Sequence, residues 1–392
     1  MHPRKWVYSA LTAALGPRAA PTIQTGPSWT MPDEGEPHAR TWMAFAWNAS
    51  IWTSDLLPVV QENLADVAEA ISRFEPVSLL VRSQDMPRAR NLLQGVSNVT
   101  LVEAQLDDLW VRDSGPVFVR RDSNVSAVDF NFNGWGNKQV HSKDATVAPT
   151  IANDSGVPLL HTELVLEGGA LEVDGNGTAI ITESCVLNDN RNPGWSKADV
   201  EAELKYLLGI DKIIWLPGIR GKDITDGYDH NVTLTHLDIL KNATDAKGRT
   251  LNVTTLTAPW ADKRRKEYQD DEDFAAGYIN YYLVNGGVIM PQFGDTKADR
   301  DARDILSAMY PDREVVAVNI DGIAAGGGGI HCSTQQEITN DGSHNATVTA
   351  EGGSTTTEAA KSSASSNSGA GRSRRRGKMG LLAGTLLGLA MV

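Results

Sequence analysis

The chain has 392 residues, of which 41% are hydrophobic and 22% are charged, and its formal net charge at pH 7 is −13. A chain of this length and composition can bury a large core, as soluble catalytic domains do. The acidic balance argues against nucleic acid as a partner, because phosphates require a basic surface, and it is compatible with a cationic substrate such as a guanidinium.

Short apolar segments rich in β-branched residues alternate with segments of helical spacing along the interior of the chain. The first kind predicts strands, at residues 77–81, 99–102, 117–120, 178–182, 212–216, 283–290 and 314–318. The second kind predicts helices, at residues 57–74, 197–208 and 296–309. Periodicity alone therefore indicates a mixed α/β fold.

One of the two cysteines, Cys332, comes shortly after four consecutive glycines and before a run of small polar residues. A cysteine attacks as its thiolate, so a reactive one needs nearby positive charge or backbone amides, and room for a substrate. Glycines supply such room because they have no Cβ atom. We therefore expect Cys332 to be reactive, the alternative being a small buried residue after a loop. Cys185, inside the apolar run 179–187, is expected to be a buried strand residue, and two cysteines form no disulfide framework.

Residues 326–336, with the sequence GGGGIHCSTQQ, closely resemble the Gly-rich His-Cys-x-Thr-Gln-Gln segment of agmatine deiminases and bacterial-type peptidylarginine deiminases, which belong to the guanidine-modifying pentein superfamily. Other stretches agree with this family in order, so that the resemblance spans about residues 30–337. They lie at residues 31–38, 41–44, 108–116, 132–136, 166–169, 188–194, 223–227, 278–282 and 291–295. The resemblance implies a five-bladed α/β propeller of ββαβ units with the active site in its central channel.

The resemblance also implies a reaction, in which ammonia is released from agmatine to give N-carbamoylputrescine, or from peptidyl-arginine to give citrulline. A thiolate attacks the guanidinium carbon to form a covalent amidino-cysteine, carboxylates hold the guanidinium plane, and a general acid and base move protons. No cofactor or metal is implied. By matching positions, Cys332 would be the nucleophile, Asp113 a guanidinium-binding carboxylate and Glu167 the carboxylate that orients a histidine or the substrate.

Trp110 and Trp135 would line the channel, and Asp226 would lie in the substrate-binding part of the site. Taken without the family, these positions have ordinary interpretations. Arg112 and Asp113 would form a surface ion pair, and Glu167 would be a turn residue.

The histidine is where this chain departs from the family pattern. Relatives continue the Asp-Gly that ends at Gly227 with His-x-Asp, which supplies the acid/base and a second guanidinium carboxylate. Here Gly227 is followed directly by Tyr-Asp-His-Asn, so a segment of about 20 to 30 residues, the size of a strand with its connections, is absent. His230 could substitute for the histidine, although residues 228–239 match the downstream helix better. We expect the blade near residues 224–231 to be incomplete.

The chain is expected to comprise an N-terminal segment, a deiminase domain, a disordered basic tail and an apolar end, at residues 1–29, 30–340, 341–379 and 380–392. The first segment is a weak match to a signal peptide. The apolar end is too short for a comfortable membrane span, but with its spacer it matches a GPI-anchor signal; the alternative is a disordered tail with a weakly apolar helix. Nine glycosylation sequons also favour secretion or the cell surface over the cytoplasm. They begin at Asn48, Asn98, Asn124, Asn153, Asn176, Asn231, Asn242, Asn252 and Asn345.

Three classes of function remain open. The first is a hydrolase that deiminates agmatine or arginyl peptides, with this chain inactive if the missing segment is not replaced. The second is a non-catalytic guanidine- or peptide-binding protein at a cell surface. The third is an amidinotransferase, which would pass the same intermediate to an amine.

Overall fold

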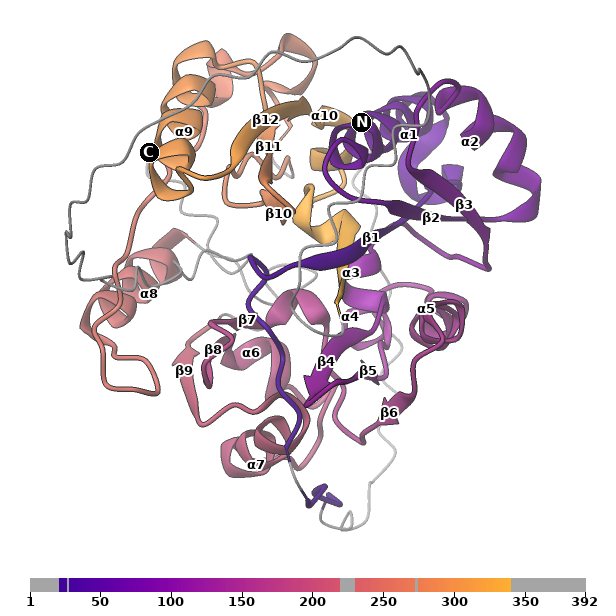
Figure 1. The fold of residues 1–392 in the computed structure, drawn as a ribbon. Coiled ribbons are helices and arrows are strands. Elements are labelled where there is room, and N and C mark those ends of the chain that lie inside the picture. Colours follow the sequence, from indigo (N-terminus) through magenta and orange to yellow (C-terminus); the bar gives the residue numbers. More distant parts are fainter. Residues whose placement is uncertain (1–20, 27, 219–229, 272–273, 340–392) are drawn as a thin grey trace, which may run out of the picture.

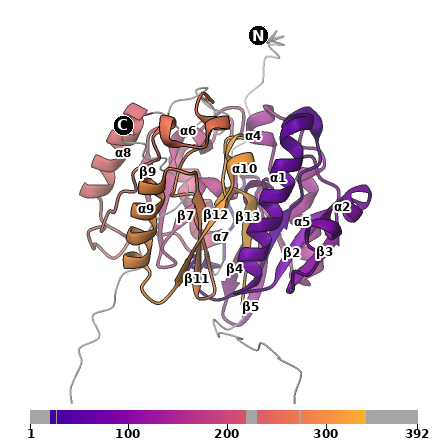
Figure 2. The same cartoon turned by 90° about the horizontal axis from the view of Figure 1, so that it is seen from above.

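The computed structural model describes residues 21–26, 28–218, 230–271 and 274–339. Within these ranges the chain forms four separate sheets, arranged around a central region that contains the short helix α3 (Val111–Ser114) (Figure 1). Seen from above, helices α1 and α2 cover one side and helices α8 and α9 the other, with strands between them (Figure 2). The expected mixed α/β fold is confirmed.

Three of the sheets repeat one ββαβ arrangement: an antiparallel strand pair, a helix, and a third strand parallel to the second. The first contains β4 (Val117–Arg121), β5 (Asn124–Asp129), α5 (Val147–Ser155) and β6 (Leu159–His161). The second contains β7 (Glu172–Val173), β8 (Thr178–Thr182), α7 (Lys197–Leu208) and β9 (Lys212–Leu216). The third contains β10 (Tyr282–Val284), β11 (Gly287–Gln292), α9 (Thr296–Met309) and β12 (Glu314–Asn319).

The fourth sheet joins the two ends of the described chain. Its strand order is β13-β1-β2-β3, and β13 pairs antiparallel with β1 so that Gln336 lies opposite Thr41. The parallel strands β1 and β2 are connected through α1, and β2 and β3 through α2. The bounds are β1 (His38–Ala44), α1 (Ala49–Ser72), β2 (Val77–Val81), α2 (Met86–Leu92), β3 (Val99–Glu103) and β13 (Thr334–Ile338).

Local sequence explains the elements that were predicted best. Helix α7 begins with a capping box between Ser196 and Asp199, and it ends at Gly209, whose φ of 71° is the left-handed conformation that glycine adopts easily. Helix α9 begins after Asp295, whose side chain accepts two backbone N–H groups of the first turn. Strands β2, β8 and β9 and helices α7 and α9 have the predicted bounds.

Two local predictions are wrong. The single strand predicted at residues 283–290 is a hairpin of β10 and β11, because Asn285 and Gly286 make a turn in which Gly286 has φ 76°. Cys185 is buried as predicted, but it lies in the short helix α6 (Glu183–Val186), which directly follows β8, and not in a strand.

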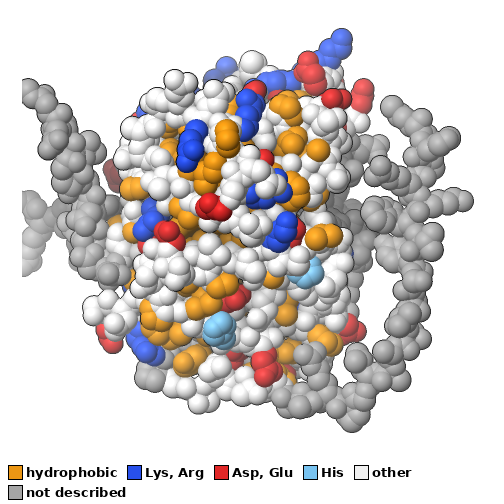
Figure 3. All heavy atoms as spheres, turned by 90° about the vertical axis from the view of Figure 1, so that its right-hand side faces the viewer, with side chains coloured by type: hydrophobic (Ala, Val, Ile, Leu, Met, Phe, Trp, Pro, Cys, Tyr) orange, Lys and Arg blue, Asp and Glu red, His pale blue; other side chains and the backbone are white. Residues whose placement is uncertain are grey.

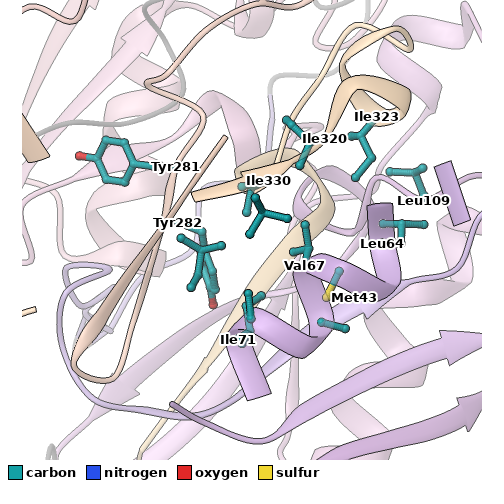
Figure 4. Packing of buried hydrophobic residues seen from close by; sticks show 14 of the residues in the cluster. Met43, Leu64, Val67, Ile71, Leu109, Tyr281, Tyr282, Ile320, Ile323 and Ile330 are labelled. Atoms are coloured by element: carbon teal, nitrogen blue, oxygen red, sulfur yellow. The ribbon is translucent and has the colours of Figure 1, made fainter. Parts of the chain in front are cut away.

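The largest hydrophobic cluster packs α1 against the C-terminal part of the domain. Leu64 and Val67 of α1 face the fully buried Ile320, Ile323 and Ile330 (Figure 4). Ile330 directly precedes the 3₁₀ helix η6 (His331–Ser333), so this packing anchors the segment that carries Cys332.

Helix α8 (His230–Asn242) lies beside the sheet that contains β9, and its Leu240 packs against Ile180, Ile214 and Leu216 of that sheet (Figure 1). The remaining short helices include α4 (Gly134–Asn137) and α10 (Asp321–Ala324). No helix in the described part of the chain is long and apolar enough to cross a membrane. On the face shown in Figure 3, acidic and basic side chains are interspersed with small hydrophobic areas.

Candidate active site

Three short helices place the predicted site residues next to one another. Helix α3, which contains Asp113, packs against both η6 and the 3₁₀ helix η3 (Gly168–Ala170). Cys332 lies in η6, and Glu167 directly precedes η3. These three residues, far apart in the sequence, are therefore brought together in the centre of the domain.

Asp113 is half-buried and accepts hydrogen bonds from two neighbouring segments. Its Oδ1 accepts from the backbone N–H of Gly169 at 2.9 Å, and its Oδ2 accepts from Nε1 of Trp135 at 2.8 Å. Burial raises the pKa of Asp113 above its usual value, while these two donors oppose the rise. Each oxygen retains a lone pair for a further donor such as a guanidinium.

Glu167 forms a buried ion pair with Arg191, which the sequence had not singled out. Nε of Arg191 donates to Oε1 of Glu167 at 2.7 Å, and the two side chains are 0% and 6% exposed. Burial raises the pKa of Glu167 to about 7, with Arg191 opposing the rise and Asp113 adding to it. Glu167 is therefore not a simple turn residue, and its raised pKa puts its titration near neutral pH.

Cys332 is partly exposed and its sulfur meets the side-chain amide of Asn280. Nδ2 of Asn280 donates to Sγ at 3.1 Å, and the backbone N–H of Cys332 donates to Oδ1 of Asn280 at 3.3 Å. Burial raises the pKa of the Cys332 thiol, Asp113 adds to the rise, and the Asn280 amide opposes it. In the absence of a ligand the thiol is thus mainly protonated at neutral pH.

Three of the glycines before Cys332 make room for the protein's own side chains. A Cβ atom at each of these three would collide with a neighbour. The closest approaches are 2.1 Å between Gly326 and Trp52, 2.3 Å between Gly328 and Trp110, and 2.6 Å between Gly329 and Asn280. The fourth, Gly327, has φ 88°, which favours glycine by itself.

The two predicted channel tryptophans are both buried and fixed. Trp110 packs against Trp52 with ring centroids 5.7 Å apart and the planes tilted by 39°, and Nε1 of Trp52 donates to Asp108 at 2.8 Å. Trp135 has the left-handed φ of 55°, which turns its indole N–H to Asp113. A non-glycine residue in that conformation is uncommon and is typical of functional loops.

Arg112 is not part of a surface ion pair with Asp113. Its side chain is 3% exposed and binds Glu34 at 3.1 Å, Gln336 at 2.8 Å and the backbone carbonyl of His331 at 3.2 Å. Nε2 of His331 also lies 2.8 Å from Glu34. The charges of His331 and Arg112 hold the pKa of Glu34 at about 2 in spite of its burial. This cluster ties the N-terminal segment to η6 and directs His331 away from the thiol.

The remaining predicted site residues are Asp226, expected in the substrate-binding part, and His230, the possible substitute acid/base. Asp226 lies outside the described residues, and His230 is the first residue of α8. In the part of the chain that the structure describes, no histidine forms a hydrogen bond with Cys332, Asp113 or Glu167. The same residues hold no group of three or more His, Cys, Asp or Glu side chains arranged for a metal ion.

Sequence reasoning missed Asn280, Arg191 and Glu34 as members of the site. Each lies inside a motif that the family resemblance marks, but no rule of spacing links it to its partner. His331 and Glu34, for example, are 297 positions apart.

Comparisons with known proteins identify the family. The model of the Porphyromonas-type peptidyl-arginine deiminase family matches residues 30–234 and 228–337. The agmatine deiminase of Pseudomonas aeruginosa is 38% identical over 351 aligned positions, which cover 78% of this chain and 95% of that protein. The agmatine deiminase of Medicago truncatula is 37% identical and covers 78% of this chain and 96% of its own length.

A solved structure resembles the fold as well. The structure of agmatine deiminase of Enterococcus faecalis has a TM-score of 0.71 with 32% identity, and the match covers 81% of this chain and 99% of that one. Since the family model covers more than half of the chain and the curated relatives exceed 30% identity over most of their length, the expected family is confirmed. The chain belongs to the Porphyromonas-type peptidyl-arginine deiminase family, and it is similar over most of its length to agmatine deiminases.

Proposed function

We propose that this protein has the site of a guanidine-deiminating hydrolase, with agmatine as the substrate and peptidyl-arginine as the alternative. The observation that carries the proposal is the convergence of a cysteine thiol, Cys332, with two carboxylates, the half-buried Asp113 and the buried Glu167, where η6 and η3 pack against α3. Carboxylates suit a guanidinium because paired hydrogen bonds and opposite charge fix its plane.

A bound guanidinium would change the protonation of this site. Asp113 and Glu167 both have raised pKa values, so a cation beside them favours their ionised forms. The same cation favours ionisation of the Cys332 thiol, which burial and Asp113 oppose in the free protein. Substrate binding would thus release protons and generate the thiolate where it is needed.

The reaction proceeds in two steps. The thiolate of Cys332 attacks the guanidinium carbon, a C–S bond forms, and the C–N bond to the protonated departing nitrogen breaks to release ammonia. Water then attacks the amidino carbon, the C–S bond breaks, and the thiolate returns as N-carbamoylputrescine, or citrulline in a peptide, leaves. The first step needs a general acid and the second a general base.

We propose that the chain as written lacks that acid/base and is inactive or nearly so. The family model matches the chain in two pieces, residues 30–234 and 228–337, and both pieces include residues 228–234. The 351 positions aligned with the P. aeruginosa enzyme correspond to 78% of 392 residues, or about 306, so about 45 positions have no residue here. General acid-base catalysis contributes about 10² to 10⁴-fold, which sets the size of the expected loss. His230 as a substitute is the alternative.

The test compares ammonia release from agmatine and from an arginyl peptide by this chain and by a version with the family's His-x-Asp segment restored after Gly227. We expect turnover only in the restored chain, and none in either chain after Cys332→Ser. Equal, full activity in both would show that another group moves the proton. Turnover in neither would contradict the proposed chemistry. Sequencing the transcript across codons 227 and 228 establishes whether the segment exists in the message.

The alternative of a non-catalytic guanidine-binding protein is favoured by the lack, among the described residues, of a histidine that forms a hydrogen bond with Cys332, Asp113 or Glu167. Calorimetry with agmatine and an arginyl peptide tests it, because binding without turnover in the restored chain would support it. An amidinotransferase would transfer the same intermediate to an amine, and product analysis with an added amine acceptor distinguishes it from a hydrolase.

The proposal extends to the fold. The four sheets around one centre, three of them ββαβ units, and α8 at a place where the described residues form no sheet of their own, support a five-bladed α/β propeller whose blade near residues 224–231 is incomplete. Residues 219–229 lie outside the described ranges.

We further propose that the protein follows the secretory route, with a GPI signal at its C-terminal end. The observation in favour is exposure of six sequon asparagines on the folded surface: Asn98, Asn124, Asn153, Asn176, Asn242 and Asn252. Expression in a eukaryotic host should give a product shifted by glycosidase and released from membranes by phosphatidylinositol-specific phospholipase. A cytosolic, unglycosylated product would refute both parts.

A further inference from the structure

We propose that Asn280 is a positioning residue for the nucleophile, holding the Cys332 sulfur in its attacking place through one side-chain amide. This inference rests on the proposed role of Cys332. The amide makes two contacts with the same residue: Nδ2 donates to Sγ at 3.1 Å, and Oδ1 accepts the backbone N–H of Cys332 at 3.3 Å. A backbone N–H can only donate, so it fixes Oδ1 on its own side and leaves Nδ2 facing the sulfur.

The segment that carries Asn280 is rigid enough for such a role. Three buried tyrosines flank it, and each hydroxyl has a partner elsewhere in the domain. Tyr278 donates to Asp299 at 2.8 Å, the Tyr281 hydroxyl lies 2.8 Å from that of Tyr310, and the Tyr282 hydroxyl lies 3.0 Å from that of Thr41. Positioning by a side chain requires that its own supports be fixed, as they are here.

The fit of Asn280 against the loop is equally close. A Cβ atom on Gly329 would lie 2.6 Å from both Cγ and Oδ1 of Asn280. The backbone N–H of His331 also donates to the backbone carbonyl of Asn280 at 3.3 Å. Glycine at 329 is thus needed for the amide to reach Cys332, and the two segments are joined on both sides of the sulfur.

The chemical consequence is support for the thiolate. An N–H donor aimed at sulfur stabilises the ionised form more than the neutral one. The other charged groups around Cys332 are few: Asp113 opposes ionisation, Arg112 favours it, and His331 is directed to Glu34. Asn280 is the neutral side chain that offsets Asp113, and its donor acts before any substrate arrives.

The test measures the rate of alkylation of Cys332 by iodoacetamide between pH 6 and 10.5, read by peptide mass spectrometry so that the buried Cys185 is counted separately. In Asn280→Asp the acceptor for the backbone N–H remains, while the donor to sulfur becomes a second acceptor. We expect alkylation at pH 7 to slow about tenfold or more, and the rate profile to move to higher pH while approaching the same plateau. Turnover is not needed for this measurement.

Asn280→Ala and Gly329→Ala complete the series, because neither introduces a charge and both remove the amide from its place. Asn63→Asp is the matched control, since Oδ1 of Asn63 also accepts a backbone N–H, that of Gly322 at 2.8 Å, at a buried site. We expect slower alkylation in both alanine variants and an unchanged profile in the control. Folded variants at position 280 that keep the original profile would overturn the inference, and so would an equal shift in the control.

If the variants at position 280 fail to fold, Gly329→Ala decides the test through its own pH profile of Cys332 alkylation. In the chain with the restored segment, loss of Asn280 should lower kcat with little change in KM, because the amide contacts the nucleophile and not the substrate. If the restored chain shows no turnover but the alkylation profile shifts as expected, the proposed function fails while the role of Asn280 stands.

Discussion

Glu167→Gln should make the protein less sensitive to pH, because the carboxyl of Glu167 is buried and its proton is held more tightly in the folded chain. Its pKa is about 7 when folded, against 4.5 for an ordinary glutamate. Between these two pH values the folded state binds more protons than the unfolded state, so stability falls as pH rises. Gln keeps an oxygen that can accept from Arg191, but it does not titrate.

The magnitude follows from the size of the shift. About 2.5 pKa units at 1.36 kcal/mol each correspond to a contribution of about 3 kcal/mol, present below pH 4.5 and lost as pH rises through 7. Between pH 5 and pH 8 we expect the free energy of unfolding of the wild-type protein to fall relative to that of Glu167→Gln by about 2 to 3 kcal/mol.

Urea denaturation at several pH values, followed by circular dichroism, measures this difference. Other buried carboxyls with raised pKa values, such as Asp144 and Asp108, lower the stability of both proteins alike and cancel in the comparison. Glu62→Gln, on the exposed side of α1, gives the effect of removing a carboxylate from the surface. A difference between wild type and Glu167→Gln that stays constant from pH 5 to pH 8 would refute the reasoning.

Three further predictions concern the site. A haloacetamidine should alkylate Cys332 in preference to the buried Cys185, and equal labelling in a mass spectrum would contradict the assignment of the nucleophile. Asp113→Asn should weaken agmatine binding by about tenfold or more in calorimetry, because a charge-assisted hydrogen bond to the guanidinium is lost; unchanged affinity would exclude this role. Gly328→Ala should lower the free energy of unfolding by about 1 to 3 kcal/mol, since its Cβ would lie 2.3 Å from Trp110, and an unchanged urea midpoint would refute that.

Regular elements with their own end signals could be predicted from the sequence. Helix α7 carries its capping box and terminal glycine in the sequence, and its bounds match the prediction. Strand β13 was not predicted, because its residues Gln335, Gln336 and Glu337 are polar. All three are buried, and distant partners bind two of them, Arg112 for Gln336 and Trp42 for Glu337. Local sequence patterns do not predict hydrogen-bond partners that lie so far apart in the chain.

In the candidate site too, some residues could be predicted from the sequence and others could not. Family resemblance singled out Cys332, Asp113 and Glu167, and the fold brings them together. The residues that hold them, Asn280 and Arg191, became visible only in three dimensions, because each meets its partner through a loop whose course depends on the packing of other sheets. Spacing in the sequence carries no information on contacts of that kind.

The pairing of β13 with β1 has a consequence for the folding of the protein during its synthesis. Among the described strands, β1 is synthesised first and cannot pair with β13 until β13 has been synthesised last. The helix η6, which carries Cys332, directly precedes β13. At roughly 5 to 20 residues per second, translation exposes an open β1 edge for many seconds before it can be closed. A nascent or prematurely terminated chain without β13 therefore lacks both the completed four-stranded sheet and a positioned thiol, and the ribosome must nearly finish the described domain before the candidate site can form.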